Sequence, residues 1–404
     1  MKSTRIRILV LSLITTISLS AQVRRAATKP PAPPPATTPA AGEALAGLTA
    51  AQRSDFADGL ADFSSVEEVS DGLGPLFNER SCAACHTTPA IGGGSTRTVT
   101  RFSRRVNGLF DALASLGGSL MQDHALGLGD GIAHEFKPES VPSIATIIVQ
   151  RRTTPLFGLG LVDATPDADF LALAQTQAAR RDGVAGRASV VDNIRAGMKT
   201  VGKFGWKAQV PSLFQFSGDA YVNEMGITTP DFPNESCPQG NCAELSYNPS
   251  PGINDDGEGP ILLTNYMTLL AAPPRAAQNR DTDDGEQTFD RIGCTACHVA
   301  TMHTGANPIA ALDRKTYHPY SDFLLHDMGS LGDDLEMGSA TGREMRTTPL
   351  WGLRFVTRYL HDARATTLEQ AILAHEGQGR GARDRFSALS AQAKSKLMAF
   401  LNSL

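Results

Sequence analysis

Four of the six cysteines of this chain lie in two pentapeptides of the form C-x-x-C-H, at residues 82–86 and 294–298. In this pattern two thiols can add to the two vinyl groups of one haem, while the adjacent imidazole ligates its iron. A disulfide, a zinc knuckle or a thioredoxin-like pair are the alternatives for C-x-x-C alone, but zinc needs four clustered ligands and a thioredoxin motif needs no histidine. The repetition of the whole pentapeptide therefore favours two covalently bound c-type haems. Their attachment residues are Cys82, Cys85, His86, Cys294, Cys297 and His298, of which His86 and His298 are the iron ligands.

The two remaining cysteines, Cys237 and Cys242, lie in the turn-rich stretch PNESCPQGNC. A local disulfide is the preferred interpretation for such a pair in an exported chain, and a third redox centre is the alternative.

An internal repeat follows each haem motif. The segment RTTPLFGL at 152–159 recurs as RTTPLWGL at 346–353, and we expect Arg152 and Arg346, which open these segments, to contact the haems. Further on, Trp206 lies seven residues before Leu213 in the first half, and His361 lies seven residues before Leu368 in the second. The first half therefore carries an insertion of about 39 residues around 160–205.

The haem face opposite the attached histidine differs between the halves. In the second half, LEQAILAHEG has helical apolar spacing and offers His375 as a sixth iron ligand. The alternatives for His375 are a helix-surface or core histidine, with Met328 or Met337 as rival ligands. His326 and His361 are equally suited to hydrogen-bonding haem propionates or backbone and to ligating iron. The corresponding first-half stretch, SLFQFSGDAYVNEMGI, contains no histidine.

This difference predicts an open first haem and a closed, electron-transferring second one. Glu224 is then the candidate acid–base that moves a proton between the two oxygens of peroxide, and Trp206 the candidate relay between the haems. The alternatives are a solvated acid at Glu224, core packing for Trp206, and ligation of the first iron by Met225.

Several segments together resemble the bacterial di-haem oxidoreductases that are similar to di-haem cytochrome c peroxidases and to the enzymes that mature the quinone cofactor of methylamine dehydrogenase. The resemblance covers roughly residues 50–404 and is carried by GLGPLFNERSCAACH, RRTTPLFGLGLVDATPD, FGWKAQVPSLFQFSGDAYVNEMGIT, YSDFLLHDMG and RTTPLWGLRFVTRYLHDARATTLEQAILAH. Matched to the peroxidase pattern, it implies catalytic roles for Trp206, Gln215 and Glu224, followed by Met225.

The chain also departs from the peroxidases. Position 375 is His where they have Met, which implies a lower potential for the second haem. Residues 87–108 contain no histidine, whereas the peroxidases have a removable distal one there, so the resemblance favours a permanently open first haem. An interdomain Ca²⁺ is a further implication, although the Thr-Ala-Pro of the peroxidases is replaced by residues 356–358, Val-Thr-Arg.

We expect a mainly α-helical fold to position these residues. It should consist of two cytochrome c-like haem domains with long loops and an insertion in the first. We predict a signal peptide at 1–21, with basic residues before an apolar stretch, and a Pro/Ala-rich linker at 22–47. The N-terminal haem domain is expected at 48–270, with the open haem, and the C-terminal one at 271–404, with the electron-transfer haem. The first of them should begin with a helix near Leu48, because LTAAQRSDFADGLADF has helical apolar spacing.

Composition narrows the function. With 37 Lys+Arg against 42 Asp+Glu the net charge is −5, which disfavours a nucleic-acid binder, and no apolar run reaches the length of a membrane span. The sequence thus predicts a periplasmic enzyme that reduces hydrogen peroxide with electrons from a small periplasmic protein, and which could form oligomers. The alternatives are a di-haem oxygenase, a protein-modifying oxidase, or a non-catalytic electron carrier or redox sensor.

Overall fold

The computed structural model describes residues 39–404, which belong to one compact unit. The predicted signal peptide, and residues 22–38 of the predicted linker, lie outside the described residues. The rest of that linker is held in place, because the amide N–H of Leu45 donates to Leu269 O at 2.8 Å and Ala271 N–H donates to Glu43 O at 3.0 Å.

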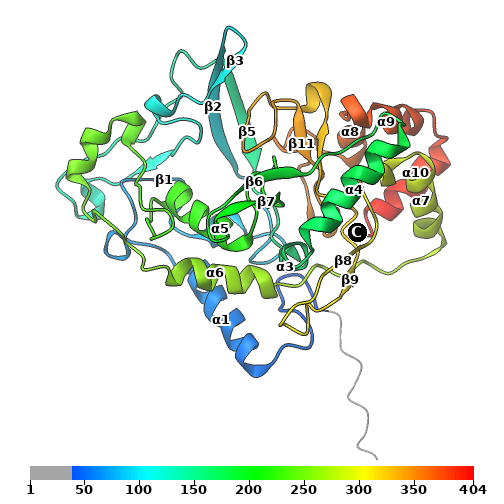
Figure 1. The fold of residues 1–404 in the computed structure, drawn as a ribbon, viewed down its shortest axis with the longest axis horizontal. Coiled ribbons are helices and arrows are strands. Elements are labelled where there is room, and N and C mark those ends of the chain that lie inside the picture. Colours follow the sequence, from blue (N-terminus) through cyan, green and yellow to red (C-terminus); the bar gives the residue numbers. More distant parts are fainter. Residues whose placement is uncertain (1–38) are drawn as a thin grey trace, which may run out of the picture. The chain divides into compact units, whose positions relative to one another are not determined.

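Helices and strands are interspersed along residues 39–404 (Figure 1). The α-helices are α1 Ala50–Ser64, α2 Cys82–Cys85, α3 Leu159–Asp163, α4 Asp167–Arg180, α5 Leu213–Ala220, α6 Glu258–Leu269, α7 Arg280–Arg291, α8 Leu368–Leu373, α9 Arg380–Ser387 and α10 Ala391–Leu401. The strands are β1 Leu76–Phe77, β2 Thr98–Val106, β3 Leu109–Asp111, β4 His124–Ala125, β5 Ile147–Arg152, β6 Ser189–Asn193, β7 Met198–Gly202, β8 Met302–His303, β9 Thr316–Tyr317, β10 Leu325–Asp327 and β11 Glu344–Arg346.

Short helical turns fill many of the connections. One is a π-helical turn, η4 Tyr221–Met225. The others are 3-10 turns: η1 Val69–Asp71, η2 Ala114–Leu116, η3 Leu128–Asp130, η5 Pro238–Gly240, η6 Cys242–Tyr247, η7 Cys294–Ala296, η8 Gly329–Leu331, η9 Leu353–Phe355 and η10 Gly377–Gly379.

The prediction of a mainly α-helical fold is wrong. The structure is 36% helical and 15% strand, a mixed α/β composition. The haem motifs themselves form only one turn of helix each, α2 and η7, and the residues between them form the β2–β3 and β6–β7 hairpins as well as the helices α3 to α7. Glycine and proline are frequent in these segments, and both interrupt helices while favouring turns.

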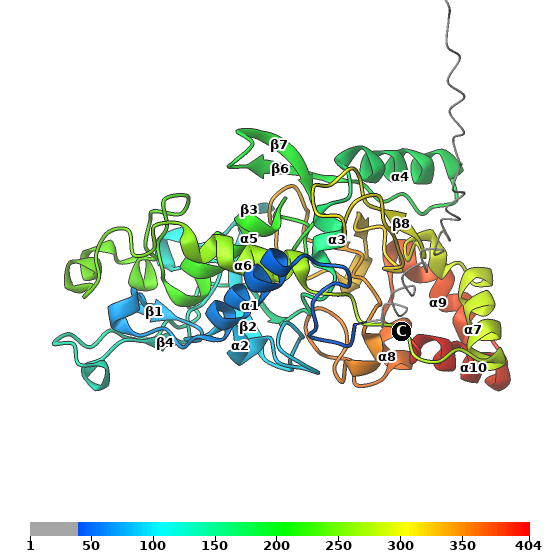
Figure 2. The same cartoon turned by 90° about the horizontal axis from the view of Figure 1, so that it is seen from below.

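The sheets are small and antiparallel. The largest has the order β3-β2-β5, with Thr98 opposite Arg152 and Arg104 opposite Asp111. Figure 2 shows that the β6–β7 hairpin, which lies inside the predicted 39-residue insertion, stands apart from this sheet. The insertion also contains α3 and α4, so it is a structured addition to the first half.

Two helix pairs frame the haem motifs. The helix α1 packs against α6, and α7 packs against α10 (Figure 1). Both leading helices begin with a capping box, at Thr49 and at Asn279, in which the side chain of the cap residue satisfies free backbone N–H groups. The predicted helix that begins after Leu48 is thereby confirmed as α1.

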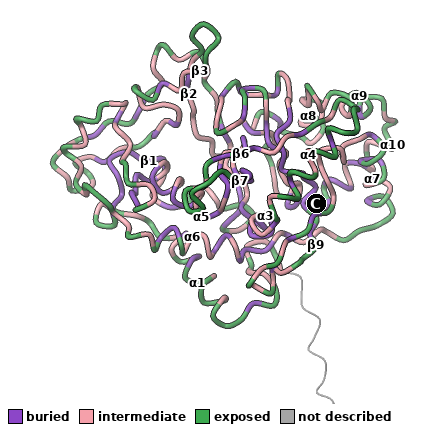
Figure 3. The backbone as a smooth tube through the Cα atoms, viewed as in Figure 1, coloured by how far each residue is buried: buried purple, intermediate pink, exposed green. Residues whose placement is uncertain are grey.

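Two large hydrophobic clusters, and a third small one of Ala208, Leu325 and Ala340, hold the described residues together. The largest extends from Phe63 to Trp351 and includes Phe157 and Tyr266, and the second joins Phe289, Phe386 and residues 397–404 near the C-terminus. Figure 3 shows buried backbone through the middle of the molecule and exposed residues at the tip of the β2–β3 hairpin. Among residues 39–404 we find no helix whose length and apolar character would let it cross a membrane.

Candidate haem sites

The second C-x-x-C-H motif opens onto a large cavity of about 730 Å³. Cys294, Cys297 and His298 all line it, and neither thiol is joined in a disulfide. The His298 Nδ1 lies 2.8 Å from Tyr320 O, so this nitrogen donates to the backbone and leaves Nε2 free to bind a metal. Burial lowers the pKa of His298 to about 4, which keeps the imidazole in the neutral form that a ligand requires.

His375 lines the same cavity, just beyond the C-terminal end of α8. That helix begins at Thr367, whose hydroxyl accepts from Gln370 N–H at 3.1 Å. The His375 Nδ1 donates to Ala371 O at 2.8 Å, so its Nε2 is free as well. The structure therefore brings the attached histidine of the second motif and the predicted sixth ligand to one cavity.

The two repeat arginines also line this cavity. Arg152 and Arg346 form no ion pair with any carboxylate of residues 39–404, and burial lowers the pKa of each to about 10. The Nε of Arg152 is buried without a hydrogen-bond partner in this part of the chain. A haem carries two propionates, and a buried guanidinium needs an anion, so the donors of this cavity fit a haem.

The first motif repeats the local geometry of the second. In α2 and the residue after it, His86 Nδ1 lies 3.0 Å from Gly93 O, and its Nε2 is free in the same way. Phe63 lies beside His86 with ring centroids 5.9 Å apart, as Phe289 lies beside His298 at 6.1 Å. The first motif therefore presents the same donor set for a haem.

The repeat seen in the sequence is a structural repeat. Leu156 N–H donates to Gly92 O at 2.8 Å in the first half, and Leu350 N–H donates to Pro319 O at the same distance in the second. Both repeat segments also end in the same kind of backbone contact. Gly158 N–H donates to Leu270 O, and Gly352 N–H donates to Leu404 O. The further prediction that 48–270 and 271–404 are separate domains stays a prediction.

The register of the repeat identifies what replaces His375 in the first half. The helices α5 and α8 begin at equivalent caps, since Ser212 accepts from the third residue of its helix as Thr367 does. Counting from these caps places Ala220 where the second half has His375. A methyl group cannot ligate iron, so the first half lacks the candidate ligand that the second half offers at this position.

Glu224 lies in the π-helical turn η4, directly after α5. Its Oε2 accepts from Asn78 Nδ2 at 2.7 Å, and its backbone carbonyl accepts from Asn78 N–H at 2.7 Å. Burial raises the pKa of this carboxyl group, while the Asn78 hydrogen bond and nearby arginines oppose the rise. Glu224 also contributes to the raised pKa of the Cys85 thiol, after burial itself, so the carboxylate lies near the first haem motif.

Comparisons with known proteins agree with two haem sites. The family described as "Di-haem oxidoreductase, putative peroxidase" matches residues 145–404. The chain belongs to this di-haem oxidoreductase family. No curated protein matches the sequence.

Two solved structures resemble the di-haem oxidoreductase weakly. The hydrazine synthase of Kuenenia stuttgartiensis is 14% identical, with 97% of this chain and 99% of that chain covered at a TM-score of 0.39. A MauG-like protein associated with microbial copper homeostasis is 12% identical, with 94% and 95% covered at the same TM-score. Similarity at this level does not bear on the activity.

Trp206 joins the two halves of the di-haem oxidoreductase. Its indole Nε1 donates to Arg152 O at 3.1 Å, and its own carbonyl accepts from Arg346 N–H at 2.9 Å. His361, its counterpart in the repeat, accepts from Arg152 N–H at 2.7 Å and lies edge-on to the indole, with ring centroids 6.2 Å apart. Both rings line the large cavity.

Gln215 does not lie with Glu224 in one hydrogen-bonded group. Its amide bonds the β6–β7 hairpin, through Ile194 N–H to Oε1 at 3.0 Å and through Nε2 to Asp192 O at 3.1 Å. Asn78, which reasoning from the sequence did not single out, is the residue that contacts Glu224. Its place four residues before the first Cys of the motif was the available signal.

The rival methionines separate in space. Met328 lines the large cavity, whereas the sulfur of Met337 lies 3.0 Å from Arg151 Nη1, and Met225 belongs to the hydrophobic core. The predicted disulfide between residues 237 and 242 is confirmed.

Residues 356–358 line a smaller cavity of about 230 Å³. Arg152 and Arg358 contribute guanidinium groups to its lining, which contains no carboxylate from the described part of the chain. Such a lining does not fit a calcium ion, whose ligands are oxygen atoms and usually include carboxylates. The predicted Ca²⁺ stays a prediction.

Proposed function

We propose that this di-haem oxidoreductase is a c-type enzyme of the periplasm that reduces hydrogen peroxide with electrons from a small donor protein. The observation that carries the proposal is the asymmetry of the repeat. One half offers His298 and His375 to a single cavity, and the other has Ala220 at the position equivalent to His375 and a partly buried carboxylate, Glu224, nearby.

The free thiols of both motifs support covalent attachment of the haems. Cys82 and Cys85, and likewise Cys294 and Cys297, would each add an S–H across a vinyl group to form thioether bonds. Once bound, haem iron supplies the redox chemistry that peroxide reduction needs. Arg152 and Arg346 would hold the propionates.

The protein side chains then divide the remaining tasks. Glu224 would accept a proton from one oxygen of hydrogen peroxide and return it to the other, so that the O–O bond breaks to release water. Two electrons and two further protons complete the reduction to two water molecules. Trp206 would relay electrons between the haems, a role that its hydrogen bonds to both halves support.

The predicted signal peptide supports export, and two c-type haems suit electron exchange with a small redox protein. Purification from a periplasmic extract, with N-terminal sequencing to find the residue after cleavage, tests the location.

The decisive experiment is electron paramagnetic resonance of the resting ferric protein, with the haem content per chain measured first. We expect two haems, one high-spin and one low-spin, and loss of the high-spin signal after addition of hydrogen peroxide. Two low-spin haems that do not respond to peroxide would instead identify a carrier, a sensor or an enzyme that must first be reduced.

Two variants assign the residues. His375→Ala should convert the low-spin haem to high spin, and an unchanged spectrum would remove His375 as a ligand. Glu224→Gln should slow peroxide turnover by roughly 10²–10⁴-fold, because it removes the proton-transferring group. Glu235→Gln, a change of the same kind at a residue outside the proposed machinery, should leave turnover intact.

A further inference from the structure

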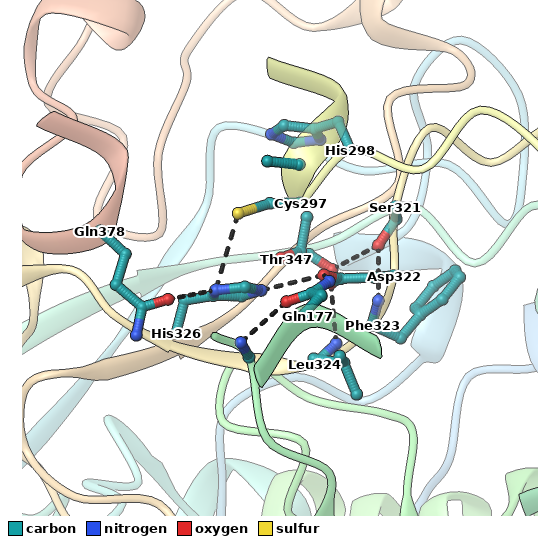
Figure 4. Close-up of polar contacts among 12 residues, drawn as sticks. Gln177, Cys297, His298, Ser321, Asp322, Phe323, Leu324, His326, Thr347 and Gln378 are labelled. Atoms are coloured by element: carbon teal, nitrogen blue, oxygen red, sulfur yellow. Dashed lines mark hydrogen bonds and ion pairs between the residues drawn. The ribbon is translucent and has the colours of Figure 1, made fainter. Parts of the chain in front are cut away.

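A buried histidine lies at the edge of the second haem motif. His326, in β10, is 1% exposed and lines the large cavity, and its Nδ1 is 3.6 Å from the sulfur of Cys297. Asp322, which is fully buried, lies on its other side (Figure 4). Cys297, Asp322 and His326 are close enough to hold a metal ion, but Cys297 belongs to the haem motif and both imidazole nitrogens already have oxygen partners.

The partner of His326 Nδ1 is a hydrogen-bond acceptor. Gln378 Oε1 lies 2.7 Å from this nitrogen. The orientation of that amide is fixed by the backbone of Ala185, whose N–H donates to Oε1 and whose carbonyl accepts from Nε2, both at 3.2 Å. With the oxygen facing the imidazole, Nδ1 has to donate.

The partner of His326 Nε2 is an acceptor as well. This nitrogen lies 2.9 Å from Asp322 Oδ2. That oxygen also accepts from Gln177 Nε2 at 2.6 Å, and Oδ1 accepts from Leu324 N–H at 3.0 Å, so both carboxylate oxygens are used as acceptors (Figure 4). The amide of Gln177 is oriented in turn by Gly186 N–H, which donates to its oxygen at 2.8 Å.

An imidazole that donates from both nitrogens is an imidazolium. Burial disfavours this charged form, but the hydrogen bonds to Asp322 and to the Cys297 thiol outweigh burial and raise the pKa of His326 to about 11. The pair is thus a cation and an anion whose charges cancel, with an imidazolium nitrogen beside the sulfur that would join the haem.

We propose that His326 is a positioning residue that sets the reduction potential of the second haem, by cancelling the buried charge of Asp322 and placing an imidazolium at the Cys297 edge. The inference rests on the proposed attachment of a haem there. Electrostatically, a lone carboxylate beside a haem favours the ferric state, and a cation favours the ferrous state, because reduction adds an electron. His326 thereby raises a potential that ligation by two histidines would set low.

The test is the midpoint potential of each haem, measured by spectroelectrochemistry on the haem-loaded protein. His326→Gln leaves Asp322 unpaired and should lower the potential of the second haem while that of the first stays unchanged. His326→Lys keeps a cation beside the carboxylate and should recover most of the shift. Gln378→Leu, at the partly exposed rim, should give a smaller shift in the same direction without disturbing the core.

His303→Gln, the same change at an exposed residue of the same half, is the matched control and should shift nothing. An unchanged potential in His326→Gln, or equal shifts in the Gln and Lys variants, would overturn the proposal and leave the proposed peroxidase function standing. A protein without a second haem would overturn both, which the haem content per chain reveals at the outset.

Discussion

Asn78 fixes both the position and the proton affinity of Glu224. Its side-chain oxygen accepts from Asp123 N–H at 3.1 Å, so the amide nitrogen has to face the carboxylate. Arg97 Nη2 donates to the Asn78 carbonyl at 2.6 Å and holds the same segment. A hydrogen bond to a carboxylate favours its ionised form, so Asn78 opposes the effect of burial on Glu224.

Asn78→Ala should therefore raise the pKa of Glu224 further. In the proposed mechanism Glu224 has to be ionised to accept a proton from peroxide, so we expect the acid limb of the pH profile of turnover to move to higher pH. The measurement is kcat/KM against pH. In a Glu224→Gln background, Asn78→Ala should leave the acid limb of this pH profile where it is. If the limb still moves, the ionisation that sets it belongs to a group other than Glu224.

Glu235 predicts a pH dependence of stability. Its Oε2 is buried with no hydrogen-bond partner among residues 39–404, and burial raises its pKa from 4.5 to about 8. Between these values the unfolded chain has lost a proton that the folded protein keeps. The stability that this group contributes is therefore complete below pH 4.5 and is lost as pH rises through about 8.

Glu235→Gln removes this loss. We compare the free energy of unfolding of the variant with that of the wild type at each pH, by chemical denaturation. The difference, variant minus wild type, should be larger at about pH 8.5 than at about pH 4. Glu135→Gln, at an exposed residue, is the control. Parallel stability curves for wild type and Glu235→Gln would show that the carboxyl group is ionised at neutral pH.

At the scale of elements, the π-helical turn η4 and the segment before the first haem motif meet at two glycines. Gly226 ends the turn with a φ of +68°, and a Cβ at this residue would lie 2.7 Å from Gly74 Cα and 2.9 Å from Leu76 O. The close approach brings the strand β1 and Asn78 next to Glu224. A π turn adds a residue to a helix, which re-aims the side chains that follow.

Gly226→Ala should destabilise the protein through both strain and collision. Gly197→Ala is the matched control, because Gly197 has a φ of +64° and a Cβ added there would meet no atom of the described residues within 4 Å. We expect the control to cost about 1 kcal/mol and Gly226→Ala to cost about 1–3 kcal/mol more, from denaturant unfolding. If both variants lose the same free energy of unfolding, the backbone around Gly74 can shift away from residue 226 without cost.

At the scale of the molecule, a buried charge cluster joins the two repeat halves. The ammonium of Lys207 bonds the carbonyls of residues 341, 342 and 344 and lies 2.9 Å from Asp333 Oδ1. Arg151 binds the other oxygen of Asp333, at 3.0 Å and 2.5 Å from Nε and Nη2. One carboxylate from the second half thus compensates two cations from the first.

Asp333→Ala would leave Lys207 and Arg151 buried without their anion. We expect a loss of about 3–5 kcal/mol in the free energy of unfolding. Asp192→Ala, which breaks the exposed pair with Lys199, should cost at most about 1 kcal/mol. A similar small cost for both variants would show that water reaches the cluster.

Local patterns in the sequence determined the parts of this protein whose chemistry depends on near neighbours. The two C-x-x-C-H motifs, the eight-residue repeat, the short disulfide and the helix that begins after Leu48 each involve residues close along the chain. The family is readable for the same reason, since its motifs are contiguous.

Tertiary structure alone decided the rest. The strand content was missed because short antiparallel hairpins depend on pairing partners, not on periodicity over a long window. Asn78 meets Glu224 across 146 residues, and His326 meets Gln378 across 52. Such contacts arise when the chain packs, and burial then sets the charges of the groups that meet, which no local pattern of residue types encodes.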